Sequence, residues 1–193
     1  QMLSGKVLYQ DIVYVRPPLP VLLRAGELLF LPDTWAVLGE RWIFYLKVGL
    51  YSWLGAAVLV PGARLWMLAT FGFVVSVHCY PPMAWHTVDG ILFSVLGIWF
   101  WTKTPSRWGA ALAGASIFAG LLCKQSFYPM AAVFAGLLIF TPHFPKVATN
   151  RAGWGIGALF FCTALFFIYL YANGLLGNYL QMTGGATSGG QAF

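Results

Sequence analysis

Asp11 and Arg16 lie in a short polar segment, and the arginine directly precedes two prolines, Pro17 and Pro18. Proline fixes the backbone and removes amide donors, so the pair would hold the arginine in a stiff loop. A rigidly held guanidinium suits bidentate binding of a phosphate group. Taken alone, the segment is more typical of a surface arginine beside a turn, so phosphate binding requires support from other residues.

His86 and Asp89 form a second polar group, three residues apart. On a helix their side chains share one face, where they could ligate a divalent metal or form an acid–base pair. The alternative is a hydrogen bond at a helix start, with the aspartate near the positive end of the dipole. Two ligands do not make a metal site, so a divalent metal is only a candidate cofactor.

Lys124 and Gln125 follow an apolar segment, where a lysine commonly snorkels and marks a helix end. The functional alternative is a cation that binds an anionic lipid headgroup. Glu40 and Arg41, with Lys47 further along, are interpreted as an interfacial ion pair and a snorkelling lysine.

The composition indicates which class of protein holds these polar residues. Of 193 residues, 60% are hydrophobic and only 8% are charged, whereas soluble domains carry roughly 25% charged residues. Together with a mean hydropathy of +0.75, this excludes a soluble enzyme, a disordered chain and a disulfide scaffold. The net charge of +6 is then attributed to cytoplasmic loops, with no nucleic-acid partner expected.

We therefore predict an all-α integral membrane protein: a polytopic bundle of about six transmembrane helices plus an interfacial amphipathic helix. Residues 1–41 form an outer-face loop that carries the interfacial helix at 20–30. Residues 42–172 form the bundle, and residues 173–193 form a flexible outer-face tail. The predicted spans are 42–60, 65–80, 83–102, 108–123, 127–141 and 154–171, and the fourth is rich in Gly and Ala, which suits close helix contact.

The charges predict an orientation for this bundle. Alternating crossings place five cations in inside loops that contain no acid, and they place all five acids on the outer face. The short inside loops thus follow the positive-inside rule. The inside cations are Arg64, Lys103, Arg107, Lys146 and Arg151, and the outside acids are Asp11, Glu27, Asp33, Glu40 and Asp89.

Two cations, Arg16 and Lys124, and two carboxylates, Asp11 and Asp89, are thereby predicted at one membrane interface. This set suits transfer of a group from a phosphate-linked donor, because cations stabilise charge on a departing phosphate. A carboxylate would deprotonate the incoming hydroxyl or hold a metal. A phosphate at the interface implies a donor carried by a lipid.

Three segments resemble motifs of GT-C glycosyltransferases, in the branch of protein O-mannosyltransferases and aminoarabinose transferases. They are 5–11 (GKVLYQD) with 16–19 (RPPL), then 87–92 (TVDGIL), then 119–125 (AGLLCKQ), in the family's order. Each motif alone is weak, and three in order are moderately specific. Val15 and Cys123 depart from the pattern, in which Glu and Thr are common.

The resemblance implies transfer of a sugar from a polyprenyl-phosphate carrier to a protein, lipid or glycan acceptor. The active face would be periplasmic in a bacterial inner membrane, or lumenal in the endoplasmic reticulum. Arg16 would bind the carrier phosphate with support from Lys124, and His86 and Gln125 would line the substrate site. Asp89 would build the acidic or metal site, with His86 as the other candidate ligand, and Asp11 would line the sugar pocket.

The family's principal catalytic acid follows its first span, which would precede Gln1, and an acceptor-binding domain would follow Phe193. We therefore expect this sequence to be an internal piece that is inactive alone. A transporter or flippase for a lipid-linked or anionic substrate is the alternative; it should show midplane polar residues and internal repeats. A structural subunit of a membrane complex is the third, and it would not need the charged residues to converge.

Overall fold

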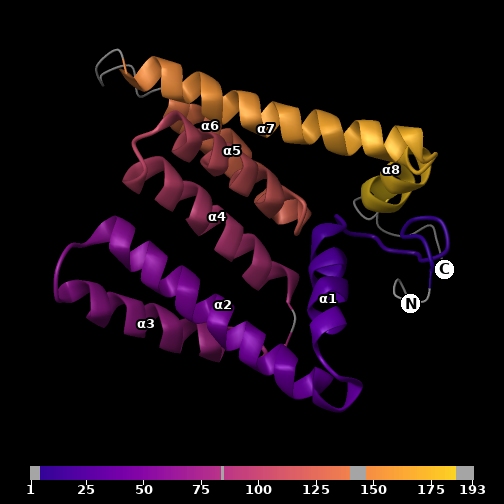
Figure 1. Cartoon of the computed structure of the whole chain (residues 1–193), viewed down its shortest axis with the longest axis horizontal. Helices are drawn as coiled ribbons and strands as arrows, with labels where there is room; N and C mark the ends of the chain where they lie inside the picture. The colour runs from indigo at the N-terminus through magenta and orange to yellow at the C-terminus, as the bar shows by residue number, and fades with distance from the viewer. Residues whose placement is uncertain (1–4, 84, 140–146, 186–193) are drawn as a thin grey trace.

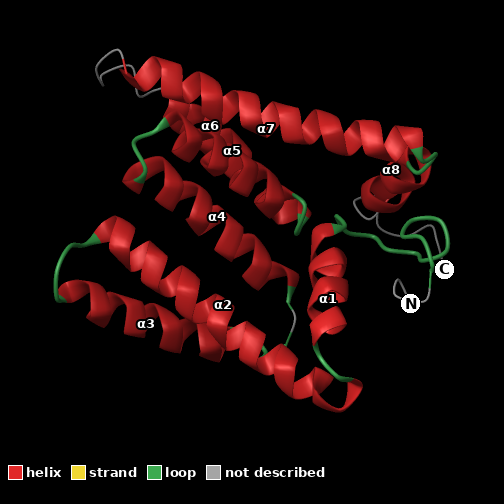
Figure 2. Ribbon diagram, viewed as in Figure 1, coloured by secondary structure: helices red, strands yellow, loops and turns green. Residues whose placement is uncertain are grey.

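The computed structural model describes residues 5–83, 85–139 and 147–185, and these residues are almost entirely helical (Figures 1 and 2). The only β-type pairing among them is one bridge between Leu8 and Ile12. In chain order the helices are α1 (Leu19–Phe30), η2 (Asp33–Trp35), α2 (Ala36–Leu59), α3 (Arg64–Cys79), α4 (His86–Lys103), α5 (Arg107–Leu121), η3 (Gln125–Phe127), α6 (Tyr128–Ile139), α7 (Val147–Ala172) and α8 (Leu176–Gly185).

The long helices form a row in which neighbours pack side by side in the order α3, α2, α4, α5 and α7, and α6 packs against α5 (Figure 1). Helix α1 lies across one end of this row, near the start of α4, and α8 folds back at the same end. The functional candidates come from this end, because the first loop, α1, the start of α4 and the end of α5 all meet there.

Glycine allows α5 to approach its neighbours closely, as the Gly- and Ala-rich sequence predicted. A Cβ atom added to Gly114 would lie 2.0 Å from the carbonyl oxygen of Gly155 on α7. On the opposite side of α5, a Cβ atom on Gly97 of α4 would lie 2.7 Å from the Ile117 side chain. At Gly114 the backbones of α5 and α7 are therefore packed at a distance that only glycine permits, whereas at Gly97 the Ile117 side chain fills the space.

The opposite end of the row carries the basic residues assigned to the inside loops. Arg64 begins α3, Lys103 ends α4 and Arg107 begins α5. Arg151 near the start of α7 donates to the carbonyl oxygens of Trp101 at 2.8 Å and Thr104 at 3.0 Å. It thereby caps carbonyl groups at the C-terminal end of α4. Lys146 lies outside the described residues.

The all-α class is confirmed, and it is compatible with a helical membrane protein. Among the described residues, two helical stretches are long and apolar enough to cross a bilayer: α2 and residues Asn150–Ala172 of α7. Helix α3 has 16 residues and is about 24 Å long, which is short of a hydrocarbon core of about 30 Å. Six crossings therefore stay a prediction, and the predicted end of the fifth span, Thr141, lies outside the described residues.

The C-terminal region differs from the flexible tail predicted for 173–193, since its first half forms α8. Tyr179 and Leu175 are buried there against Tyr9 and Leu8, and Asn178 donates to the Tyr9 carbonyl oxygen at 3.0 Å. These apolar residues pack α8 against the first loop. The glycine-rich sequence of this region did not predict that contact, because its partners lie near the other end of the chain. Residues 186–193 lie outside the described residues.

Candidate functional site

Tyr9 fixes the loop that presents Arg16. Its ring is buried, and its hydroxyl donates to the Arg16 carbonyl oxygen at 2.6 Å. Burial raises the pKa of Tyr9 above its ordinary value, so the phenol stays protonated and keeps donating. Pro17 is also fully buried. The stiff loop predicted from the proline pair is therefore present, and its arginine is only half-buried.

Gln125, the first residue of η3, holds the same loop from the other side. Its amide donates to the Val15 carbonyl oxygen at 3.0 Å, and the backbone N–H of Leu19 donates to the Leu122 carbonyl oxygen at 3.1 Å. The side chain predicted to bind substrate thus makes a backbone contact in this structure. It joins two segments about 110 residues apart and positions Arg16.

His86 contacts the Arg16 guanidinium. Nη1 of Arg16 lies 2.9 Å from Nδ1 and 3.1 Å from Nε2 of the imidazole, so it faces the ring edge between the two nitrogens. His86 is buried and packs beside Trp85, and Lys124 acts on it as a second nearby positive charge. Because a guanidinium carries only donors, Arg16 donates and the imidazole accepts in this contact.

Arg16 and His86 are in contact, and Lys124 lies near enough for its charge to act on His86. We call these three residues the cationic cluster. Lys124 follows the end of α5 and is half-buried. None of the ion pairs in the described part of the chain includes Arg16 or Lys124. The cluster thus holds two positive charges that no described carboxylate neutralises, and such a group attracts an anion.

Asp89 is buried one helical turn beyond His86, and its carboxylate is already paired. Oδ1 accepts from Lys47 Nζ at 2.7 Å, and the same Nζ donates to Glu27 Oε1 at 2.6 Å. Lys47 therefore connects α2 to α4 and to α1. The prediction of a snorkelling lysine was wrong, because two carboxylates from other helices approach it inside the protein.

The predicted ion pair of Glu40 with Arg41 was also wrong. Glu40 pairs with Arg24 of α1, and Arg24 also lies 3.5 Å from Glu27. Burial lowers the pKa of Arg24, and the adjacent Glu27 opposes that shift. We call Arg24, Glu27, Glu40, Lys47 and Asp89 the ionic network; it joins α1 to the bundle. A sequence neighbour was the wrong partner because residues 40 and 41 point in different directions on a helix.

A metal is poorly supported by this arrangement. His86 faces Arg16 while Asp89 is held by Lys47, so the two candidate ligands do not converge. Within the described ranges, no group of three or more His, Cys, Asp or Glu side chains could hold a metal ion. The Lys47 ammonium occupies the position between two carboxylates where a metal cation would bind, so these residues do not fit a metal.

Asp11 lies apart from the cluster in an exposed turn, where its Oδ2 accepts from the Val7 backbone N–H at 2.8 Å. This is a local turn contact that stabilises the first loop. The structure therefore brings together Arg16, His86 and Lys124, with Asp89 adjacent, and leaves Asp11 outside.

Tyr14 and Lys47 are the residues that the motifs did not single out. Burial raises the pKa of the Tyr14 phenol, and nearby Arg16 opposes the shift while Asp89 adds to it. Tyr14 thus lies close to both the cationic cluster and the ionic network. Lys47 could have been recognised, because an ionisable residue within an apolar segment normally has a function or a partner.

Comparison with known proteins gives no identification: no family model, curated protein or solved structure matches the chain.

Proposed function

We propose that this chain is part of the membrane core of a glycosyltransferase that takes a sugar from a polyprenyl-phosphate carrier. The carrier phosphate binds the cationic cluster, and the sugar passes to a protein, lipid or glycan acceptor on the outer face. That face is periplasmic in a bacterial inner membrane and lumenal in the endoplasmic reticulum. The six apolar helices α2 to α7 cross the membrane, and α1 lies at its interface.

The observation that carries this proposal is the contact of Arg16 with His86, together with the absence of Arg16 and Lys124 from the ion pairs of the described residues. An arginine whose loop is hydrogen-bonded by Tyr9 and Gln125 needs little reorganisation to bind a phosphate. When the bond between sugar and phosphate breaks, both cations stabilise the charge that develops on the departing phosphate. The resemblance of the segments around these residues to GT-C motifs points to the same use.

Asp89 lies one helical turn from His86 on α4 and takes the acidic position of the site. Lys47 orients it through a 2.7 Å hydrogen bond and would be a positioning residue. Asp11 is not included, because its carboxylate serves the turn at Val7.

Binding of a polyprenyl phosphate by the purified chain tests the proposal, with the matching polyprenol as the uncharged probe. We expect binding of the phosphate and little binding of the alcohol. Arg16→Ala should weaken phosphate binding about tenfold or more, since hydrogen bonds to charged groups contribute roughly 1.5–3 kcal/mol.

Arg41→Ala is the matched control, because Arg41 is an exposed cation with no ion pair among the described residues. Its affinity for polyprenyl phosphate should stay within about twofold of the parent chain, as expected for a single exposed charge. Equal binding of phosphate and alcohol, or equal losses in both variants, would contradict the proposal.

A transporter or flippase for a lipid-linked substrate is the second candidate, and the ionic network favours it. Buried ion pairs between helices are typical of pathways for ions and polar substrates. In reconstituted vesicles that contain a labelled polyprenyl-phosphate sugar, movement of intact substrate between leaflets would support this candidate. Release of the sugar to an acceptor would support the glycosyltransferase.

A further inference from the structure

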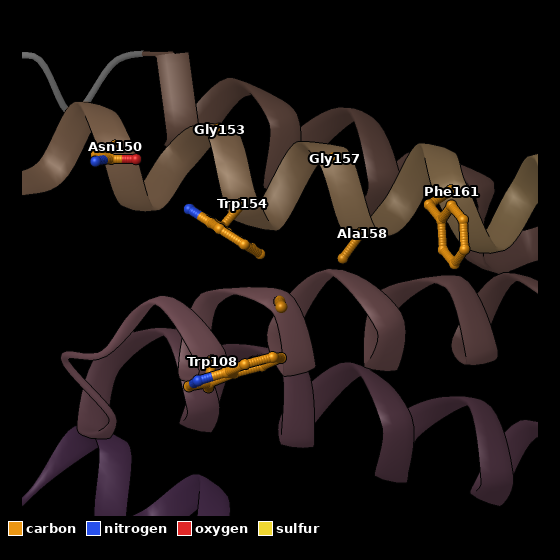
Figure 3. A pocket seen from close by; sticks show the side chains of 8 residues that line it. Trp108, Asn150, Gly153, Trp154, Gly157, Ala158 and Phe161 are labelled. Atoms are coloured by element: carbon orange, nitrogen blue, oxygen red, sulfur yellow. The ribbon is translucent and has the colours of Figure 1, made fainter.

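A surface groove lies between α5 and α7 at the basic end of the row, away from the cationic cluster (Figure 3). Its volume is about 600 Å³, within the range of pockets that hold small ligands. Trp108 of α5 faces Trp154 of α7, with ring centroids 6.1 Å apart, and Ala158 and Phe161 extend the apolar wall along α7.

Two glycines keep this groove open. Gly153 and Gly157 line it on α7, and a Cβ atom added to either would meet nothing within 4 Å. Gly155 between them is different, because it faces α5 in the tight contact with Gly114. The close packing of the helices therefore does not require Gly153 and Gly157, which instead leave space at the surface.

Positive charge gathers where the groove begins. The Arg107 guanidinium lies over the Trp154 ring, 5.9 Å from its centroid. Helices α5 and α7 both start at this end, so the positive ends of their dipoles point there. No described ion pair includes Arg107, and the sequence places no acid between Asp89 and the C-terminus.

We propose that this groove binds one acyl chain of an anionic phospholipid of the inner leaflet, whose phosphate lies at Arg107. The apolar walls match the chain, and the tryptophans match the water–lipid boundary, where such rings concentrate. The cation and the two helix starts match the phosphate.

Lipid retention tests the proposal. The chain is extracted in mild detergent from membranes of equal phosphatidylglycerol and phosphatidylcholine content, and its bound lipid is measured by mass spectrometry. Arg107→Gln should lower the ratio of bound phosphatidylglycerol to phosphatidylcholine about fivefold, the factor that one cation contributes near an anionic surface.

Gly157→Leu should expel both lipids, because its side chain fills the groove. Gly136→Leu is the matched control, since a Cβ atom there also meets nothing within 4 Å and α6 does not line the groove. As a second measurement, phosphatidylglycerol with brominated chains should quench tryptophan fluorescence in the parent chain and less in Gly157→Leu.

An unchanged lipid ratio in Arg107→Gln overturns the proposal. So does lipid retention in Gly157→Leu equal to that in Gly136→Leu, which is the result expected if a second polypeptide covers the groove. Polyprenyl-phosphate binding at the cationic cluster should be unaffected by either variant, so the outcome is independent of the proposed function.

Discussion

Single side chains at the end of the bundle where the first loop, α1 and the start of α4 meet (Figure 1) divide into two groups with different chemistry. Arg16 and Lys124 carry charge that no described carboxylate neutralises, whereas Lys47 is bound to Asp89 and Glu27. The sequence placed Arg16, His86, Asp89 and Lys124 in one region because their motifs fall at successive outer ends of apolar segments. The pairing of Lys47 could not be predicted from the sequence, since its partners Glu27 and Asp89 lie 20 and 42 residues away.

Lys47→Met tests the ionic network at the residue scale. The change leaves Asp89 and Glu27 as adjacent carboxylates without their shared cation, and breaking a buried pair in this way costs about 3–5 kcal/mol. We expect a clear loss of thermal stability in detergent. Lys103→Met, at an exposed helix end, is the control, and equal melting temperatures for the two variants would contradict the network's structural role.

Asp89→Asn should be milder than Lys47→Met, because Lys47 keeps Glu27 as its partner and the amide oxygen can still accept a hydrogen bond. The double variant Lys47→Met/Asp89→Asn should be more stable than Lys47→Met alone, because Asp89→Asn removes one of the two carboxylate charges left without a cation. Thermal unfolding of the two single variants and the double variant measures this coupling. Strictly additive effects would show that the two residues do not interact.

At the scale of elements, the apolar segments predicted the bounds of α3, α4 and α5 to within three residues, because hydrophobic runs ended by Pro, Gly or charged residues mark helix bounds. Helices α2 and α7 begin six and seven residues before the predicted starts at 42 and 154. Helix α1 was also expected. Helix α8 was not, because its stability comes from Tyr179 and Leu175 packing on the N-terminal loop. Contacts of that range leave no local pattern in the sequence.

Gly114→Ala should separate α5 from α7, since its Cβ atom would collide with the Gly155 carbonyl oxygen. Overpacking at a helix contact costs typically 1–3 kcal/mol, and a collision with backbone places this variant near about 3 kcal/mol. The measurement is the unfolding free energy in mixed micelles. Gly136→Ala, where the new methyl group meets nothing within 4 Å, should unfold like the parent chain, and similar losses in both would argue against the close contact.

Ser106→Ala should weaken the start of α5. The Ser106 hydroxyl accepts from the Gly109 backbone N–H at 3.0 Å, and loss of such a cap costs about 1 kcal/mol. Ser106→Asp should retain most of the stability, because a carboxylate also caps a helix start. Unfolding in mixed micelles distinguishes the two, and equal stability of the alanine and aspartate variants would refute the capping role.

At the scale of the whole molecule, alternate chain reversals lie at opposite ends of the row, and the basic residues Arg64, Lys103 and Arg107 share one of them (Figure 1). This arrangement fits the orientation that the charges predicted. The six crossings stay a prediction, because α3 is shorter than a bilayer requires when it stands upright, and α2 and residues Asn150–Ala172 are the stretches long and apolar enough among the described residues.

Cysteine accessibility tests the orientation. Cys79 is exposed at the end of α3, so a membrane-impermeant maleimide should label it from the outer side of intact cells. In a Cys79→Ser background, Ala63→Cys in the loop between α2 and α3 should react only after the membrane is opened. Labelling of both positions from the same side would contradict the alternating topology.

The most direct test of the central claim is an experimental structure of the chain with a bound polyprenyl phosphate. We expect phosphate density within hydrogen-bond distance of the Arg16 guanidinium and the Lys124 ammonium, beside His86, with Asp89 still bound to Lys47. Phosphate density at the basic end near Arg107, with Arg16 and Lys124 unoccupied, would contradict it.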